Sequence, residues 1–195
     1  MNAVILLRAG AALLLCFLSL SMPAPAVAED FDLARLNDGG YVVLLRHVKA
    51  GGSDADDFDL RNCRTQRRVE APGRRQAAEL KARFEAADVT VVRLVSSQYC
   101  RAKQTAELLD MGPVTEEPAL NYFHWSTGDK EATYAALRRY IIDLAPSADG
   151  PPLVLVSHTH AFTVIGQEPV KSGGGLVLRP NGSDRPEVVG EITPP

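Results

Sequence analysis

The sequence predicts an α/β fold, a three-layer sandwich with a mostly parallel central sheet and helices on both faces. Short aliphatic runs, typical of buried strands, alternate along the chain with longer stretches whose apolar residues recur at helical spacing. Strands and helices that alternate in this way are typical of a parallel sheet with crossover helices. A length of 195 residues suffices for one domain with a full core and is too short for two comfortable ones.

In the first half of the chain, a short helix and an Asn-Asp-Gly-Gly turn lead into the first strand. That strand is predicted from five uncharged residues, Tyr41 to Leu45, four of which are aliphatic. The helix after Pro72-Gly73 is predicted from alanines, Leu80 and Phe84, which share one apolar face. The expected elements are, in order, a helix over 32–36, a strand over 41–45, a helix over 74–87, a strand over 89–95 and a helix over 101–109.

The second half continues the alternation and ends in a hairpin at the sheet edge. Its long helix presents five apolar or aromatic residues at helical spacing: Tyr134, Leu137, Tyr140, Ile141 and Leu144. Asn181-Gly182 between two aliphatic runs indicates the hairpin turn. The expected elements are a short strand over 114–116, a helix over 129–144, a strand over 153–157, and hairpin strands over 175–179 and 187–192.

The first 28 residues are expected to lie outside this fold. Arg8 precedes an apolar run over 11–20, and the small residues Ala26-Val27-Ala28 follow. This order is typical of a secretory signal peptide that is cleaved after Ala28. We therefore expect a domain spanning 29–195, a secreted or periplasmic location, and no stable membrane insertion after cleavage.

Two other uses of this leader stay open. An uncleaved membrane anchor needs about 20 apolar residues, and the apolar run is shorter. Lipid attachment at Cys16 needs a small residue before the cysteine, and Leu15 is bulky. Both alternatives are therefore less favoured than a cleaved signal.

The two remaining cysteines, Cys63 and Cys100, are expected to form a disulfide. Their number is even, and the chain is expected to enter an oxidising compartment. Such a bridge stabilises a domain by roughly 4 kcal/mol in the loop-entropy account. The alternative is a pair of unpaired buried cysteines.

Composition excludes one large class of partner. Hydrophobic residues make up 46% and charged residues 23% of the chain, as in an ordinary globular protein. The formal net charge is −3 and there is no long basic run, so no nucleic-acid partner is expected. The loop over 49–65 carries four aspartates and then two arginines, which is typical of a solvated surface. Because it follows a strand end, the alternative is a rim or lid over a site.

Cationic or near-cationic residues follow three of the predicted strands. Arg46 and His47 come directly after the first strand, Arg101 opens the helix after the second, and His158 follows the strand over 153–157. Taken singly, Arg46 is better explained by a salt bridge and His47 by a satisfied core histidine. Because parallel strands end at one edge of a sheet, all four side chains are expected to meet there.

Two arginines, two histidines and a helix start indicate a phosphate site. Arginine forks hold the phosphoryl oxygens and offset the charge that develops on them. Helix N-termini add backbone N–H groups that bind anions. A histidine with one nitrogen free and the other hydrogen-bonded is a competent nucleophile toward phosphorus, and the second histidine steadies the transferred group.

Four segments, in this order and spacing, make the chain similar to the histidine phosphatase superfamily, whose fold is phosphoglycerate-mutase-like. The similarity runs from about Asp32 to Gly190. The segments are Leu45-Arg46-His47, Gly73-Arg74-Arg75-Gln76-Ala77, Ser96-Ser97-Gln98-Tyr99-Cys100-Arg101-Ala102-Lys103-Gln104-Thr105-Ala106 and Val156-Ser157-His158.

The resemblance implies a catalytic role for each of the four residues. His47 is expected to be phosphorylated during turnover, and Arg46, Arg101 and His158 to bind the phosphoryl group. The implied cycle has two steps, attack by His47 and then hydrolysis of the phosphohistidine by water. No cofactor or metal is expected.

The general acid is not identified, because the family's usual positions hold no carboxylate here. The segment Pro118-Ala119-Leu120-Asn121-Tyr122 lacks the glutamate of one branch, and Thr159 stands where another branch has an aspartate. The candidates for the acid are Asp57, Asp59, Glu117 and His124, and for each of them the simpler interpretation is a surface side chain. His160 lies two residues past His158, and its simpler interpretation is a helix-start residue that points away from the pocket.

The favoured function is therefore an exported phosphatase acting on a small-molecule or lipid-linked phosphomonoester. A substrate with a good leaving group, such as an acyl phosphate or a phosphohistidine, needs little help from an acid. The alternative function is a catalytically weak or inactive phosphate-binding protein that retains the anion pocket.

Overall fold

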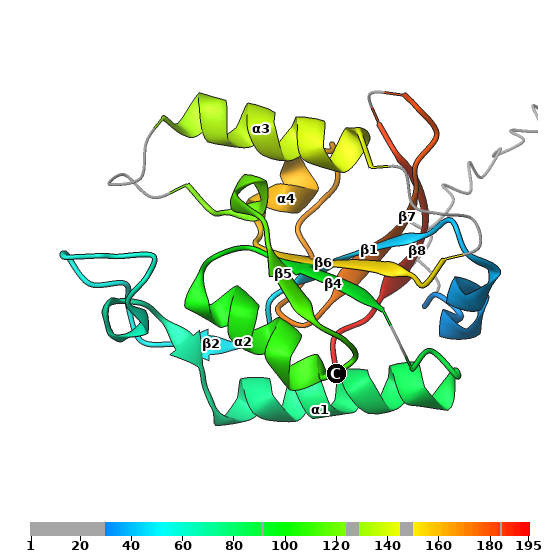
Figure 1. Cartoon of the computed structure of the whole chain (residues 1–195), viewed down its shortest axis with the longest axis horizontal. Helices are drawn as coiled ribbons and strands as arrows, with labels where there is room; N and C mark the ends of the chain where they lie inside the picture. The colour runs from blue at the N-terminus through cyan, green and yellow to red at the C-terminus, as the bar shows by residue number, and fades with distance from the viewer. Residues whose placement is uncertain (1–29, 91, 124–128, 145–149, 184) are drawn as a thin grey trace, which may run out of the picture.

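A computed structural model of the chain describes residues 30–90, 92–123, 129–144, 150–183 and 185–195. The predicted signal segment, its cleavage site and the candidate acid His124 lie outside the described residues. Figure 1 shows one central sheet with helices on both faces, as the sequence predicts. Among the described residues, no helix has the length and apolar character needed to cross a membrane.

The central sheet has six strands in the order β5-β4-β6-β1-β7-β8. The first four in this order are parallel to one another, whereas β7 runs antiparallel to both β1 and β8. The sheet is therefore mostly parallel and carries the predicted hairpin at one edge. The strands are β1 (Val42–Arg46), β4 (Arg93–Ser96), β5 (Val114–Glu116), β6 (Leu153–Ser157), β7 (Gly175–Arg179) and β8 (Glu187–Ile192).

Helices cover both faces of the sheet (Figure 1). Val43 and Leu45 of β1 belong to the core under α1 and α2, whereas Val42 and Leu44 belong to the core under α3 and α4. Because β1 is buried on both faces, it consists of consecutive aliphatic residues rather than an alternating pattern. The helices are α1 (Ala71–Ala86), α2 (Cys100–Leu109), α3 (Lys130–Ile142) and α4 (His160–Thr163).

A small two-stranded ribbon connects β1 to α1 beside the main sheet. β2 (Ala50–Gly51) pairs with β3 (Arg68–Val69), and the loop between them contains the 3-10 helix η2 (Cys63–Thr65). The start of α1 packs closely on this ribbon, since a Cβ at Gly73 would clash with the carbonyl oxygen of Lys49. Two further 3-10 helices are η1 (Leu33–Asp38) and η3 (Pro118–Leu120).

Several elements differ from the sequence predictions in their bounds: the first helix is a 3-10 helix over 33–38, α1 begins three residues earlier, at Ala71, and α3 is shorter at both ends. The strand expected over 89–95 begins only at Arg93, although Val89 and Val92 are buried in the core. In α3, Leu137 and Ile141 are fully buried, but Tyr134 packs on His160 rather than on the sheet. Hydrophobic spacing thus identified the helix, but not which of its apolar residues pack on the sheet.

Candidate active site

The parallel strands β1, β6 and β4 end side by side and bring the predicted residues around one cavity. Arg46 pairs in register with Ser157, and the His47 N–H donates to the Ser157 carbonyl at 3.0 Å. The cavity has a volume of about 530 Å³. It is lined by Arg46, His47, Gly52, Ser53, Asp54, Arg67, Arg101, Tyr122, His158 and Thr159.

His47 is held with one ring nitrogen free. Its Nδ1 lies 2.8 Å from the carbonyl oxygen of Val48, and a carbonyl only accepts, so Nδ1 carries the hydrogen. Nε2 therefore keeps its lone pair. Burial and then the nearby Arg101 cation lower the pKa of His47 to about 3, so the ring is neutral at ordinary pH. This is the protonation state that nucleophilic attack requires.

His158 lies next to His47, with the two ring centroids 5.3 Å apart. Its Nε2 is 2.8 Å from Ser97 Oγ, and its Nδ1 is buried with no hydrogen-bond partner among the described residues. Burial, then Arg101 and His47, keep the pKa of His158 well below its usual value. Both histidines of the cavity are thus neutral while it holds no anion.

The half-buried Arg46 and the buried Arg101 place positive charge beside the two histidines. Arg46 donates from Nη1 to the Val170 carbonyl at 2.8 Å. Arg101 lies 4.5 Å from the Tyr99 ring centroid and 3.4 Å from Asp54 Oδ1. Burial lowers the pKa of Arg101 to about 10, although Asp54 opposes this shift. Because the Nε of both arginines is buried and unpaired among the described residues, the pair is suited to an anion.

Two residues of the loop before β3 also line the cavity and were not predicted as site residues. Asp54 Oδ1 accepts from the Arg67 N–H at 2.9 Å, which ties the two ends of the loop together. Burial and then the Arg67 cation lower the pKa of Arg46, so this third guanidinium acts on the same cavity. The mixed charge of this loop was the only sequence signal for these two residues. Of the alternatives given for it, a rim over the site is the one observed, and the loop is called the rim loop below.

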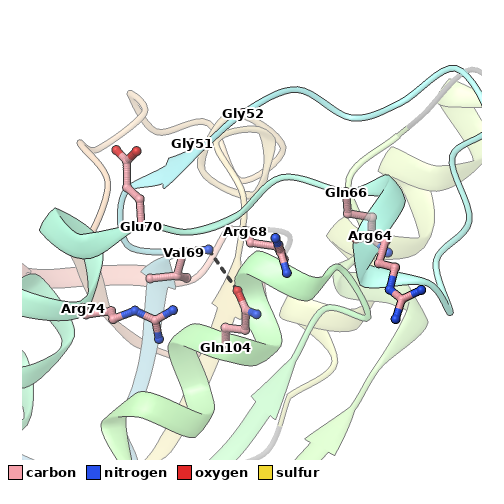
Figure 2. A pocket seen from close by; sticks show the side chains of 9 residues that line it. All are labelled: Gly51, Gly52, Arg64, Gln66, Arg68, Val69, Glu70, Arg74 and Gln104. Carbon is pink, nitrogen blue, oxygen red and sulfur yellow. Dashed lines mark hydrogen bonds between the residues drawn. The ribbon is translucent and has the colours of Figure 1, made fainter.

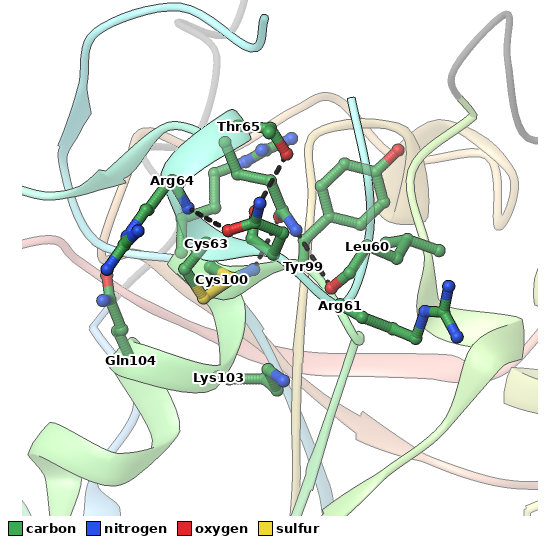
Figure 3. The surroundings of a disulfide bond; sticks show 12 residues. Leu60, Arg61, Cys63, Arg64, Thr65, Tyr99, Cys100, Lys103 and Gln104 are labelled. Carbon is green, nitrogen blue, oxygen red and sulfur yellow. Dashed lines mark hydrogen bonds between the residues drawn. A yellow bond between two sulfur atoms is a disulfide. The ribbon is translucent and has the colours of Figure 1, made fainter. Parts of the chain in front are cut away.

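A disulfide between Cys63 and Cys100 fixes this loop to the start of α2 (Figure 3). Beside it, the Cys100 N–H donates to Gln66 Oε1 at 2.9 Å. The sequence predicts that N–H groups at this helix start bind a phosphate. The Cys100 N–H does not do so, because it is used within the protein. The bridge instead positions Arg101, the residue next to Cys100, against the loop that carries Asp54.

None of the proposed acids that the structure describes lines the cavity. Asp57 is exposed, Asp59 accepts from the Arg61 N–H, and Glu117 accepts from the Ala119 N–H at the start of η3. These contacts agree with the simpler interpretation of each as a surface or capping residue. Within the described ranges, no group of three or more histidine, cysteine or acidic residues is arranged to hold a metal ion.

His160 is buried outside the cavity lining. Its Nε2 donates to the Asn121 carbonyl at 3.1 Å, and its ring packs against Tyr122 and Tyr134. Burial lowers the pKa of His160 to about 4, although the hydrogen bond to Asn121 favours its charged form. The His160 ring thus does not line the cavity, but it stacks on His158, with the two ring centroids 6.0 Å apart.

A match to a family model defines the class of this protein. Residues 42–140, half of the chain, match the model of the histidine phosphatase superfamily (branch 1). The chain belongs to this superfamily. No curated protein matches the sequence significantly.

Solved structures of the same fold include the protein histidine phosphatase SixA complexed with tungstate. It is 16% identical, with a TM-score of 0.55, and the match covers 78% of this chain and 96% of SixA. TTHB049 from Thermus thermophilus is 20% identical, with a TM-score of 0.55 and coverage of 78% and 99%. The putative phosphohistidine phosphatase SixA from Agrobacterium tumefaciens is 16% identical, with a TM-score of 0.54 and coverage of 80% and 99%. At these identities the likeness establishes the shared fold.

Proposed function

We propose that the protein is an exported phosphatase that hydrolyses phosphomonoesters through a phosphohistidine at His47. The observation that carries this proposal is the state of the His47 ring. Its Nδ1 is fixed by the Val48 carbonyl, and its neutral Nε2 belongs to a cavity lined by three arginines and a second histidine. A free imidazole nitrogen among cations is suited to attack a phosphorus atom whose oxygens those cations hold.

The chemistry takes two displacements at phosphorus. In the first, an N–P bond forms to Nε2 of His47 as the P–O bond to the leaving group breaks. In the second, a water oxygen attacks phosphorus, the N–P bond breaks and orthophosphate leaves. Arg46, Arg67 and Arg101 bind the phosphoryl oxygens throughout, and His158 contacts the group as it transfers.

A second candidate substrate is a phosphoramidate such as a protein phosphohistidine. Asp54 is the one carboxylate lining the cavity among the described residues, and it is engaged by Arg101 and the Arg67 N–H. A substrate with a good leaving group depends least on a proton donor. Two of the solved structures described above carry the name phosphohistidine or protein histidine phosphatase, which favours including this substrate.

Turnover of p-nitrophenyl phosphate, an alkyl phosphate and a phosphohistidine peptide tests the proposal and ranks the substrates. We expect orthophosphate release from at least one of them, and loss of that release in His47→Ala. A quench that avoids acid should trap phosphate on His47, detected by mass spectrometry. Tight phosphate binding without turnover of any of the three would instead support the alternative of a phosphate-binding protein.

Export is supported by the leader sequence and by the disulfide, since such bridges persist mainly in oxidising compartments. We expect the exported protein to begin at Glu29 and to have no free thiol. N-terminal sequencing and alkylation under non-reducing conditions check both points. A product that retains Met1, or free thiols at Cys63 and Cys100, would contradict export by this route.

A further inference from the structure

Asn121 belongs to the segment after Leu120 that lacks the glutamate of one branch of the family, and its amide orientation is fixed by its neighbours. The backbone N–H of Gln98 donates to Oδ1 at 2.8 Å, and Nδ2 donates to Gln98 Oε1 at 3.0 Å. Because a backbone N–H can only donate, the atom that faces it must be the amide oxygen. The side chain therefore presents an acceptor to residues 97 and 98.

This acceptor determines the direction of the Ser97 hydroxyl. Ser97 Oγ lies 3.0 Å from Asn121 Oδ1, which only accepts, so the hydroxyl donates its single hydrogen there. Of the two lone pairs on Ser97 Oγ, one accepts from the Tyr99 N–H at 3.2 Å. The other faces Nε2 of His158 at 2.8 Å. Nε2 must then carry the hydrogen of the neutral ring.

Nδ1 of neutral His158 is consequently left with a lone pair. It is buried without a partner among the described residues, in a side chain that lines the catalytic cavity. A lone pair opposite a phosphoryl oxygen is repulsive, and one proton between them turns the contact into a hydrogen bond. Burial and the neighbouring Arg101 hold the pKa of this ring low, so the empty site does not supply that proton.

We propose that Asn121 is a positioning residue that holds His158 as the Nε2–H tautomer, so that the site takes the singly protonated phosphoryl group, whose O–H donates to Nδ1. This inference rests on the proposed function, which places a phosphoryl group between His47 and His158. The described part of the site offers no free carboxylic acid as a proton donor. A singly protonated phosphoryl group brings its own proton into the site and thus offsets part of this lack.

The tautomer is measured directly by proton–nitrogen correlation NMR of the histidine rings. The chain has four histidines, so single substitutions assign the signals. We expect His158 of the resting protein to be the Nε2–H form, and Asn121→Ala to populate the Nδ1–H form, because the Ser97 hydroxyl is then free to donate to Nε2. Gln98→Ala is the matched control: it removes a partner of the Asn121 amide nitrogen but keeps the backbone N–H, and should leave the tautomer unchanged.

The pH dependence of binding tests the consequence. By calorimetry with inorganic phosphate, affinity for total phosphate should fall about tenfold per pH unit above the second pKa of phosphate, and less steeply in Asn121→Ala. An Nδ1–H signal for His158 in the wild type, or an affinity that does not change with pH, would overturn the inference. Both measurements can be made on the wild-type protein without turnover, so this failure is distinct from inactivity on all three substrates, which refutes the proposed function.

A separate cavity carries a second inference. Arg64, Arg68 and Arg74 surround a cavity of about 470 Å³ between the β2–β3 ribbon, α1 and α2, here called the arginine cleft (Figure 2). They belong to the segment 61–75, which has six arginines and one acidic residue in a chain of net charge −3. That acidic residue, Glu70, also lines the cleft and lies 3.7 Å from Lys49. Among the described residues, the three arginines have no carboxylate partner.

The arginine cleft adjoins the catalytic cavity. Gly52 lines both of them. Arg67 lines the catalytic cavity and Arg68 lines the cleft, since neighbouring residues of an extended segment point to opposite sides. A substrate whose reacting phosphate lies beside His47 therefore has a second, cationic surface within reach across Gly52. We infer that the arginine cleft binds a further phosphate of the substrate, an inference that again rests on the proposed function.

Linear inorganic polyphosphates are suitable probes, as inhibitors of p-nitrophenyl phosphate hydrolysis. The ratio of the inhibition constants of orthophosphate and tripolyphosphate measures the contribution of the extra phosphates. We expect Arg64→Gln and Arg68→Gln each to lower this ratio about tenfold, the value of one exposed charge-assisted contact. The matched control is Arg75→Gln, an exposed arginine of the same segment outside the cleft. An equal effect of all three variants, or no effect of any, would refute phosphate binding in the arginine cleft. Hydrolysis of p-nitrophenyl phosphate without inhibitor tests the proposed function separately.

Discussion

Removal of the disulfide is expected to reduce both stability and substrate binding. Cys63 lies in η2 of the rim loop, and Cys100 is the first residue of the helix that carries Arg101. The bridge thus connects the loop that provides Asp54 and Arg67 to the helix that provides Arg101. In Cys63→Ala/Cys100→Ala, the loop is held by noncovalent contacts alone, such as the hydrogen bond from the Cys100 N–H to Gln66, the Asp54–Arg101 ion pair and the packing of Phe58 on Tyr99.

The magnitude follows from the length of the closed loop. The two cysteines are 37 positions apart, for which the loop-entropy account gives about 4 kcal/mol of unfolding free energy. For a domain of this size each kcal/mol lowers the melting temperature by about 2–4 °C, so a decrease of about 10 °C is expected. KM for p-nitrophenyl phosphate should rise at the same time, because the guanidinium of Arg67 is no longer held at the cavity.

Thermal denaturation followed by circular dichroism measures the first effect, and steady-state kinetics below the transition measures the second. Wild-type protein treated with a reductant should behave like the double variant, which separates loss of the bridge from loss of the sulfur atoms. A melting temperature and a KM equal to those of the oxidised wild type would show that the noncovalent contacts alone hold the loop. The reasoning about the bridge would then be wrong.

Three further outcomes are expected. Unfolding free energy should decrease as pH falls below about 6.5, because the three buried histidines bind protons in the unfolded chain but have lower pKa values in the folded protein, about 3 for His47. Melting temperature measured against pH tests this, and a flat profile contradicts it. Arg67→Gln should raise KM for p-nitrophenyl phosphate about tenfold through loss of a charged contact, whereas Arg75→Gln should not; equal KM values in the two variants would refute a substrate role for the cavity arginine. Gly73→Ala should lower the unfolding free energy by about 1–3 kcal/mol in denaturant titration, since its Cβ meets a backbone carbonyl; unchanged stability would mean that the ribbon shifts freely.

The sequence by itself determined the sheet, the order of its elements and the edge at which chemistry gathers. A strand buried on both faces must be a continuous aliphatic run, so Val42 to Leu45 could be recognised without coordinates. Parallel strands share one carboxyl edge, so Arg46, His47 and His158 had to lie close together once the sheet was parallel. Local pattern was sufficient because both facts depend on backbone geometry.

Only the tertiary structure decided which polar residues serve that edge. Asp54 and Arg67 belong to a mixed-charge loop whose pattern is the same on any solvated surface, and the ribbon and the disulfide bring them to the cavity. The role of Asn121 depends on three hydrogen bonds to a segment more than twenty residues away. Hydrogen-bond partners are set by which loops meet in space, and neither hydrophobic periodicity nor residue spacing carries that information.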